Sequence, residues 1–152
     1  MNKLKAVATA SAAVLALAAP VVMTFEGLRT DPYRDPVGIL TVCYGETHAP
    51  MRRYSPAECQ DMLAASLAQH WQQIAACVPA DAPDRVKAAS ASFAYNVGPA
   101  AFCGSSMSRK LLARDYAGGC AELSRWTYAG GQQLPGLVKR RAAERALCEG
   151  RA

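Results

Sequence analysis

The sequence opens with an uncharged run that constrains every interpretation of the fold. It extends from Ala6 to Phe25, 20 residues between Lys5 and Glu26. As a helix it would be about 30 Å long, which matches the hydrocarbon core of a bilayer. Its large apolar side chains are few, and alanine fills most of the remaining positions. We therefore expect the run to engage the export machinery but to stay in a bilayer only marginally.

Four interpretations of this run remain open. It is a cleaved signal peptide, since Ala16-Leu17-Ala18 fits a small-residue cleavage site, or a stable anchor, which its alanine content disfavours. It is an uncleaved anchor weak enough to leave the membrane later, or a buried helix of the folded domain. Lysines before the run predict a cytoplasmic N-terminus and an exported remainder. We accordingly divide the chain into an export segment, residues 1–25, and a folded domain, residues 26–152.

Cysteine usage agrees with export. The chain has six cysteines and no CxxC pair, so the spacing supports neither a zinc site nor a redox motif. An even number of cysteines in an exported chain indicates disulfides, but the spacing does not choose among the possible pairings. The cysteines are Cys43, Cys59, Cys77, Cys103, Cys120 and Cys148, and none lies in the uncharged run.

Length and composition limit the class of protein. A chain of 152 residues predicts one folded domain, and 51% hydrophobic residues exclude a disordered chain. The net charge of +5 suits an anionic partner, such as nucleic acid, a membrane surface or a cell wall, without choosing among them. Two histidines, His48 and His70, cannot by themselves build a three-histidine zinc site.

Local patterns predict a small sheet followed by helices. Alternation over residues 39–44 predicts a strand, and Ser55-Pro56-Ala57-Glu58 has the pattern of a capping box that opens a helix. Further boundary signals are typical of a helical body. They are Asp84 as a second cap, Asn96 or Gly98 as its stop, Ser105 or Ser106 as a third start, a short helix near 119–126, a loop at 129–131, and a last helix from Pro135 to about Cys148. The expected class is α+β, mostly α.

Two carboxyl groups are candidates for acid–base chemistry. Hydrolysis of a sugar–sugar bond needs an acid to protonate the leaving oxygen and a second polar group to hold or activate water. Glu26 follows an apolar run, and apolar surroundings favour a protonated carboxyl group, whereas Asp35 lies in a Gly/Pro-bearing turn. The alternative is that these are solvated loop charges, since Asp31, Glu46 and Asp61 are also available.

The spacing of three residues adds a family resemblance. Eight residues separate Glu26 from Asp35, and five separate Asp35 from Thr41. This resembles the Glu-Asp-Thr triad of phage-type lysozymes, glycoside hydrolase family 24. Stretches at 92–98, 102–106 and 125–144 resemble the same family in the same order. The resemblance covers about residues 24–149 and extends to endolysins of lambdoid phages whose signal-arrest-release segment is not cleaved.

The resemblance implies a fold and a set of roles. The fold is a small β-hairpin lobe and a helical lobe with the active-site cleft between them. Glu26 would be the general acid, and Asp35 and Thr41 would position and activate water. The substrate would be the β-1,4 bond between N-acetylmuramic acid and N-acetylglucosamine in peptidoglycan, whose cleavage lyses the host cell. The further roles are cleft lining by Asn96, Gly98 and Phe102, pairing of Arg140 or Arg141 with acids at the base of the cleft, and disulfides Cys43–Cys59, Cys77–Cys103 and Cys120–Cys148.

The resemblance also bears on partners and location. It implies a monomer in the host periplasm, first tethered to the inner membrane by residues 6–25, with no cofactor or metal. The export signal and the absence of a basic stripe disfavour a nucleic-acid partner. Because the uncharged run has no cysteine, a thiol switch within it is excluded. Phe93 and Trp126 are expected to pack in the core. The competing function is an exported, disulfide-stapled wall-binding protein without catalysis, which has no need of an intact triad.

Overall fold

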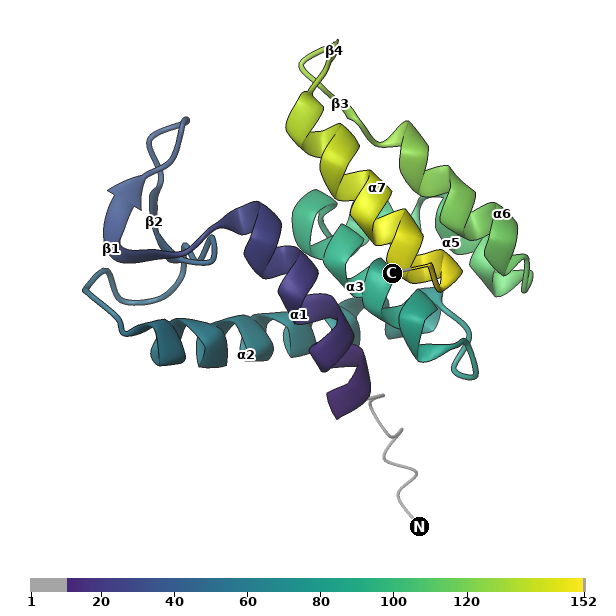
Figure 1. Ribbon diagram of the computed structural model, residues 1–152, viewed down its shortest axis with the longest axis horizontal. Helices are drawn as coiled ribbons and strands as arrows, with labels where there is room; N and C mark the ends of the chain where they lie inside the picture. The colour runs from purple at the N-terminus through teal and green to yellow at the C-terminus, as the bar shows by residue number, and fades with distance from the viewer. Residues whose placement is uncertain (1–10, 152) are drawn as a thin grey trace.

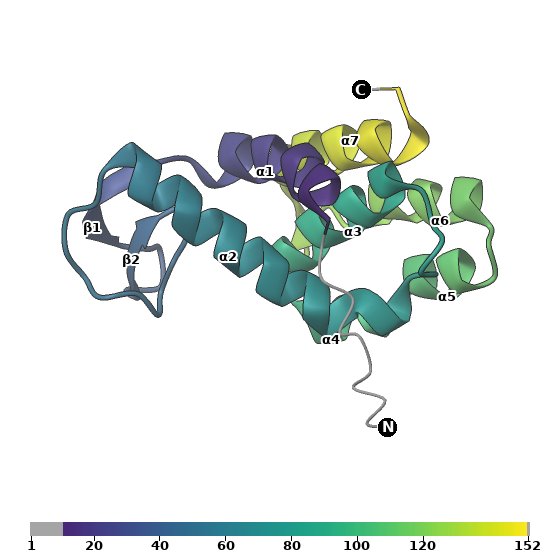
Figure 2. The same cartoon turned by 90° about the horizontal axis from the view of Figure 1, so that it is seen from below.

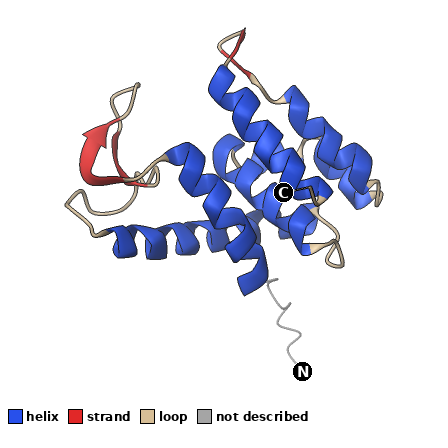
Figure 3. Ribbon diagram, in the orientation of Figure 1, coloured by secondary structure: helices blue, strands red, loops and turns tan. Residues whose placement is uncertain are grey.

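The computed structural model describes residues 11–151 as helices with two small hairpins (Figures 1 and 3). The elements are α1 (Ala12–Glu26), β1 (Arg29–Arg34), β2 (Leu40–Cys43), α2 (Pro56–Ile74), η1 (Ala75–Cys77), α3 (Asp84–Val97), α4 (Pro99–Cys103), α5 (Ser106–Leu112), α6 (Tyr116–Glu122), η2 (Leu123–Arg125), β3 (Tyr128–Ala129), β4 (Gln132–Gln133) and α7 (Pro135–Glu149). The expected α+β class with a mostly helical content is confirmed.

The β1–β2 hairpin forms the small lobe at one end of the molecule (Figure 1). The strands are antiparallel, with Tyr33 opposite Thr41 and Arg34 opposite Leu40. The long helix α2 runs from beside this hairpin to the helical body near α4 (Figure 2). The strand expected at residues 39–44 therefore exists as β2, and the two lobes follow one another along α2.

The capping box that opens α2 is present as expected. The Ser55 hydroxyl accepts a hydrogen bond from the Glu58 amide, and the Glu58 carboxylate accepts one from the Ser55 amide at 2.7 Å. Pro56 is the first helical residue, where a missing N–H costs nothing. The buried face of α2 consists of Cys59, Leu63, Leu67, Trp71 and Ile74. The capping hydrogen bonds thus determine where α2 begins, and its buried apolar face packs it against the helical body.

The boundaries of the other helices agree with the sequence only in part. Gly98 ends α3 with φ +93°, and Ser105 caps α5, both as expected. Asp84 is the first residue of α3 and not its cap, because Pro83 takes the N-cap position. The expected short helix begins earlier, at Tyr116, since the Asp115 carboxylate accepts from the Gly118 amide and caps it there. Helix α4 was not anticipated.

The expected loop at 129–131 is the turn of a second, very short hairpin. Tyr128 pairs with Gln133 and Ala129 with Gln132. The two residues of the turn, Gly130 and Gly131, have φ of 58° and 79°. Positive φ at both central positions is the requirement of a tight hairpin turn, and glycine meets it without strain. This turn delivers the chain to α7.

Helix α1 packs into the core of the helical body. Its buried residues Val14, Ala18 and Val22 follow one another at four-residue steps, and they face α3 chiefly, with α2 and α7 alongside. The structure therefore shows most of the uncharged run as a helix of the folded protein, across the boundary expected at residue 25. No helix among residues 11–151 combines the length and the apolar character that crossing a membrane requires. The lysines at positions 3 and 5, and the orientation expected from them, lie outside the described residues.

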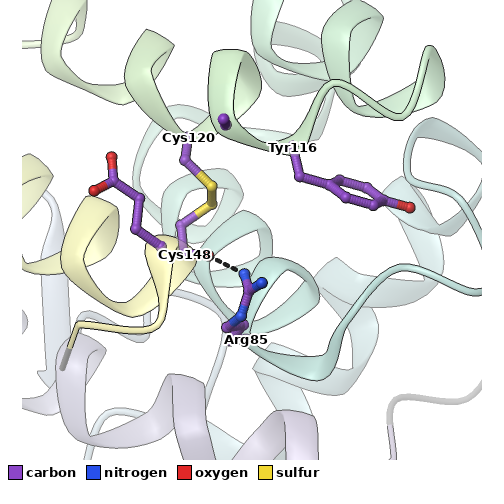
Figure 4. A pocket seen from close by; sticks show the side chains of 6 residues that line it. Arg85, Tyr116, Cys120 and Cys148 are labelled. Atoms are coloured by element: carbon purple, nitrogen blue, oxygen red, sulfur yellow. Dashed lines mark hydrogen bonds between the residues drawn. A yellow bond between two sulfur atoms is a disulfide. The ribbon is translucent and has the colours of Figure 1, made fainter.

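The protein has three disulfides, one in the small lobe and two in the helical body. They confirm the pairing that the resemblance implied. Cys43–Cys59 joins β2 to α2, Cys77–Cys103 joins η1 to α4, and Cys120–Cys148 joins α6 to α7. Arg85 donates a hydrogen bond to the carbonyl oxygen of Cys148 beside the last of these (Figure 4). The cavity there has a volume of about 340 Å³ and includes none of the candidate catalytic residues.

Candidate active site

Glu26 is the last residue of α1, and two elements fix its carboxylate. Nη1 of Arg140, on α7, donates to Oε1 of Glu26 at 2.7 Å. The Glu26 side chain is 23% exposed, and the Arg140 side chain is 4% exposed. The other oxygen, Oε2, lies against Gly45, where a Cβ would come within 3.2 Å of it. Gly45 has φ +82°, so both the space and the backbone favour glycine. Glu26 is therefore held beside a guanidinium, and not in the purely apolar setting that the sequence suggested.

Asp35 and Thr41 lie on the hairpin that follows Glu26. Asp35 Oδ1 accepts hydrogen bonds from the amides of Val37 at 3.0 Å and Ile39 at 2.9 Å. Thr41 is buried, and its hydroxyl donates to the carbonyl oxygen of Ile39 at 3.0 Å. Both side chains are thus fixed by the turn between β1 and β2. Asp35 Oδ2 makes no hydrogen bond to any residue between 11 and 151 and remains available as an acceptor.

Behind Glu26 lies a buried cluster of charges on α7. Arg140 and Arg141 are 3% and 1% exposed, and Glu144 is fully buried. Arg141 is ion-paired with Glu144, and the Ser92 hydroxyl donates to Glu144 at 2.6 Å. Burial lowers the pKa of Arg141, while the Glu144 carboxylate acts in the opposite direction. The alternative of a solvated helix face is wrong, because both guanidinium groups lie in the interior and pair with acids.

A cavity of about 350 Å³ lies on one side of Glu26. Its lining residues are Phe25, Glu26, Asn96, Leu134, Gly136, Leu137 and Arg140. Asn96 was expected there from the resemblance. Gly98 does not line it and instead ends α3.

Phe102 is a correction. It is completely buried, and the centroid of its ring lies 6.1 Å from that of Phe93 in an edge-on arrangement. Phe102 therefore packs in the core and not along the cleft. Phe93 itself is fully buried, as expected, and Trp126 packs edge-on against it at 5.1 Å.

A second, polar hollow of about 280 Å³ includes Gly45 in its lining. Its lining residues are Gly45, Glu46, Thr47, His48, Ser66, Gln69, His70 and Tyr95. Tyr95 donates to the carbonyl oxygen of Tyr44 at 2.6 Å, which ties α3 to the hairpin lobe. Burial, with the carboxylates of Glu46 and Glu26, raises the pKa of Tyr95. Glu26 thus lines the first hollow, and Gly45, which lies against its Oε2, lines the second.

Sequence reasoning missed several residues of this site. Tyr95 lies in a stretch that resembles the family, which was the available signal for it. The hydrogen bond from Ser66 to Glu46 joins α2 to the segment after β2, and no sequence signal marked it. Among the described residues, no group of three or more His, Cys, Asp or Glu side chains could hold a metal ion.

A carboxyl group backed by a buried arginine, and followed by a hairpin with an aspartate and a threonine, is the arrangement that the resemblance to phage-type lysozymes implies. The phage lysozyme family model matches residues 23–144. The SAR-endolysin of bacteriophage PS119 is 44% identical over 126 residues, which cover 81% of this chain and 75% of the relative. The chain belongs to the phage lysozyme family.

Solved structures agree. The active form of the P1 phage endolysin Lyz aligns with a TM-score of 0.78 at 25% identity, covering 88% of this chain and 83% of that one. The secreted inactive form of the same endolysin aligns with a TM-score of 0.57 at 20% identity, covering 93% and 96%. The protein is a peptidoglycan-hydrolysing endolysin with lysozyme activity. These matches do not favour a wall-binding protein without catalysis.

Proposed function

We propose that Glu26 is the general acid of this lysozyme and that Asp35 and Thr41 hold and activate the attacking water. The bond cleaved is the β-1,4 link between N-acetylmuramic acid and N-acetylglucosamine. The observation that carries the proposal is the position of Glu26, which lines one hollow, is fixed by Arg140 and lies against Gly45 of the second hollow. A glycan strand lying along both hollows would pass its scissile oxygen over this carboxyl group.

The hairpin supplies the second half of the chemistry. The Thr41 hydroxyl donates its hydrogen to the carbonyl oxygen of Ile39. Its oxygen lone pairs therefore remain free to accept a hydrogen bond from water. Asp35 uses one oxygen to hold the turn and keeps Oδ2 as an acceptor for a second water hydrogen. Two acceptors that hold one water orient its lone pair for attack and take up its proton as the bond forms. Glu26 meanwhile gives its proton to the leaving oxygen.

Glu26→Gln tests the assignment, because glutamine keeps the shape but cannot donate a carboxylic proton. We expect lytic activity to fall by roughly 10²–10⁴-fold with an unchanged circular dichroism spectrum, and Asp35→Asn and Thr41→Ala to be impaired as well. Zymography on chloroform-treated Gram-negative cells measures this. Asp31→Asn is the matched control, since Asp31 is an exposed carboxylate on β1. A folded and active Glu26→Gln protein would overturn the assignment.

We also propose that residues 6–25 tether the protein to the inner membrane and then leave it intact, which puts the active enzyme in the periplasm. The relatives named SAR-endolysin support this. While the run spans the membrane, Glu26 lies within a residue or two of the lipid interface. It then cannot meet Arg140 and Gly45, so the tethered protein is inactive by geometry.

Fractionation with intact-mass measurement tests the tether. A full-length protein that moves from the membrane to the soluble periplasm after depolarisation supports it. Four leucines placed within residues 6–19 should give a membrane-bound, non-lytic protein. A cleavable signal placed before Ser11 should give lysis at once, because α1 is retained. A protein already shortened at Ala18 and soluble from the start means a conventional signal peptide.

A further inference from the structure

A single hydrogen bond joins the helices from α3 onward to the hairpin lobe, residues 27–54. Tyr95, near the C-terminal end of α3, donates from its hydroxyl to the carbonyl oxygen of Tyr44 at 2.6 Å. Within the described residues, no other hydrogen bond or ion pair links residues 84–151 to this lobe. The lobe's disulfide and its bond from Ser66 to Glu46 both lead to α2. The place of the lobe relative to α3 therefore depends on Tyr95.

The acceptor belongs to a peptide group that lies against the proposed acid. The carbonyl of Tyr44 and the amide of Gly45 form one planar unit, so they move together. A Cβ on Gly45 would come within 3.2 Å of Oε2 of Glu26. A shift of the Tyr44 carbonyl therefore changes the contact between Gly45 and the carboxyl group.

The acid and the water-holding residues belong to different parts of the molecule. Glu26 is fixed to α7 through Arg140, whereas Asp35 and Thr41 lie on the hairpin. If the lobe moves, these two side chains move with it, but the acid stays with the helical body. The bond from Tyr95 therefore bears on the distance between the two halves of the proposed chemistry.

The ring of Tyr95 is itself fixed by α2. It lies against the imidazole of His70, with 5.0 Å between the ring centroids and an interplanar angle of 43°. Nδ1 of His70 is hydrogen-bonded to the carbonyl oxygen of Ser66 at 2.7 Å, and it carries the hydrogen because a carbonyl only accepts. Both rings thus have defined places, and the hydroxyl is aimed at Tyr44.

The hydroxyl of Tyr95 remains a donor at neutral pH. Burial, with the carboxylates of Glu46 and Glu26, raises the pKa of Tyr95, and the Arg140 guanidinium acts in the opposite direction. A phenol whose pKa lies above its usual value near 10 keeps its hydrogen throughout the neutral range. The bond to Tyr44 is therefore present under the conditions of a lytic assay.

We propose that Tyr95 is a positioning residue for the glycosidase reaction. Its hydroxyl holds the Tyr44–Gly45 peptide group against Glu26 and so sets the place of the acid relative to the hairpin that holds the water. The inference rests on the proposed role of Glu26, and it gives Tyr95 no contact with the substrate. Tyr95 acts through the backbone, and its ring without the hydroxyl does not replace it.

Tyr95→Phe tests the proposal, because it removes the hydroxyl and keeps the ring on His70. We expect kcat to fall about tenfold and KM to stay within about twofold, since an acid and a water that are misplaced relative to each other slow the chemical step without weakening binding. Soluble glycan strands serve as the substrate. A wild-type kcat in Tyr95→Phe overturns the proposal.

Tyr54→Phe is the matched control. The Tyr54 hydroxyl also donates to a carbonyl oxygen, that of Pro50 at 2.7 Å, but within the small lobe and outside both hollows. Each variant loses one bond of the same kind, so both should lose similar thermal stability, and only Tyr95→Phe should lose kcat. An equal loss of kcat in both variants would mean a merely structural role and would overturn the proposal.

Hydrogen–deuterium exchange shows whether the peptide group is released. We expect the amides of residues 42–46 to exchange faster in Tyr95→Phe than in the wild type, and at the wild-type rate in Tyr54→Phe. A lower kcat with unchanged exchange over these residues would contradict the route through the backbone.

A double-mutant cycle with Gly45→Ala tests the route to the acid. Both substitutions disturb the same contact with Glu26, so the double variant should lose less kcat than the product of the two single losses. Losses that multiply would overturn the route through Gly45. Glu26→Gln is assayed separately. If Glu26→Gln is active, the proposed function fails, whereas an inactive Glu26→Gln beside a fully active Tyr95→Phe removes the positioning role alone.

Discussion

The buried charged side chains behind Glu26 need more polar partners than other side chains of the core. Arg140, Arg141 and Glu144 lie in the interior, where an ion needs a partner for each polar atom. Arg141 has a partner for all three kinds of nitrogen, but Arg140 Nε has none among the described residues and lies 3.6 Å from Glu144. Glu144 thus serves both guanidinium groups, and its loss should be felt by both.

At the residue scale, we expect Glu144→Gln to lower the free energy of unfolding by about 3–5 kcal/mol, because it leaves the buried Arg141 without its anion and removes one of the two acids beside Arg140. Glu149→Gln on the same helix is the control. Its partners Arg145 and Arg151 are partly solvated, so its removal should cost less than about 1 kcal/mol. Urea unfolding of the three proteins measures the difference. Equal losses for the two variants would contradict the role given to Glu144.

How much of the site can be predicted from the sequence depends on how far apart its residues lie along the chain. Glu26, Asp35 and Thr41 lie within 16 residues, so their spacing survives as a recognisable pattern. The hydrogen bond from Arg141 to Asn96 joins residues 45 apart, and no local pattern marks it. The assignment of Phe102 to the cleft is wrong for a related reason. A phenylalanine four residues after Gly98 suits the wall of a cleft and a hydrophobic core equally well. Only its packing against Phe93 shows that it lies in the core.

At the scale of elements, the proposed tether requires one sequence in α1 to suit both a bilayer and the protein interior. Its inward residues Val14, Ala18 and Val22 fit the face of α3, and its outward face carries no charge. A larger outward residue adds apolar surface without touching the core. A larger inward residue adds the same surface but must fit against α3. Two single substitutions therefore separate packing from membrane affinity.

We expect Ala18→Leu to destabilise the soluble protein by about 1–3 kcal/mol through overpacking. Ala16→Leu, on the exposed side of α1, should change stability by less than about 0.5 kcal/mol. Both add one leucine to the run, so they raise membrane affinity alike. Thermal unfolding of the purified proteins measures the contrast. An unaffected Ala18→Leu protein would mean that α1 is not tightly packed on α3.

Helix boundaries show which local signals suffice. Ser55 and Glu58 form a reciprocal cap, and that chemistry is complete within four residues, so the start of α2 follows from sequence alone. The start of α6 was misplaced because Asp115, its cap, was not recognised as one. The packing of α1 could not be predicted by any such signal. An uncharged run suits a bilayer and a protein interior equally, and the face of α3 that receives it is formed by residues far along the chain.

At the scale of the whole molecule, the disulfides link elements that already pack in the core. They close segments of 16, 26 and 28 residues, one in the small lobe and two in the helical body. None of the six cysteines remains free. A cross-link of this kind lowers the entropy of the unfolded chain. The hairpin lobe, with only two short strands, should depend on its disulfide most.

We expect reduction to lower the free energy of unfolding by about 2–4 kcal/mol for each disulfide lost. Cys43→Ala with Cys59→Ala should in addition lower lytic activity at temperatures where the helical body remains folded, because Asp35 and Thr41 lie on the lobe that this pair secures. Circular dichroism and zymography on the same samples measure the two effects. Free thiols in the exported protein would contradict this account of its stability.

The ion pair between Glu26 and Arg140 joins the first described helix to the last, across 114 positions of the chain. A nascent polypeptide that has not yet reached α7 has its acid but lacks the guanidinium that orients it and the wall of the hollow beside it. Synthesis must therefore pass Arg140 of α7 before Glu26 can take up this arrangement. Products that end before α7 should therefore leave the wall uncut, since they lack the partner that orients Glu26.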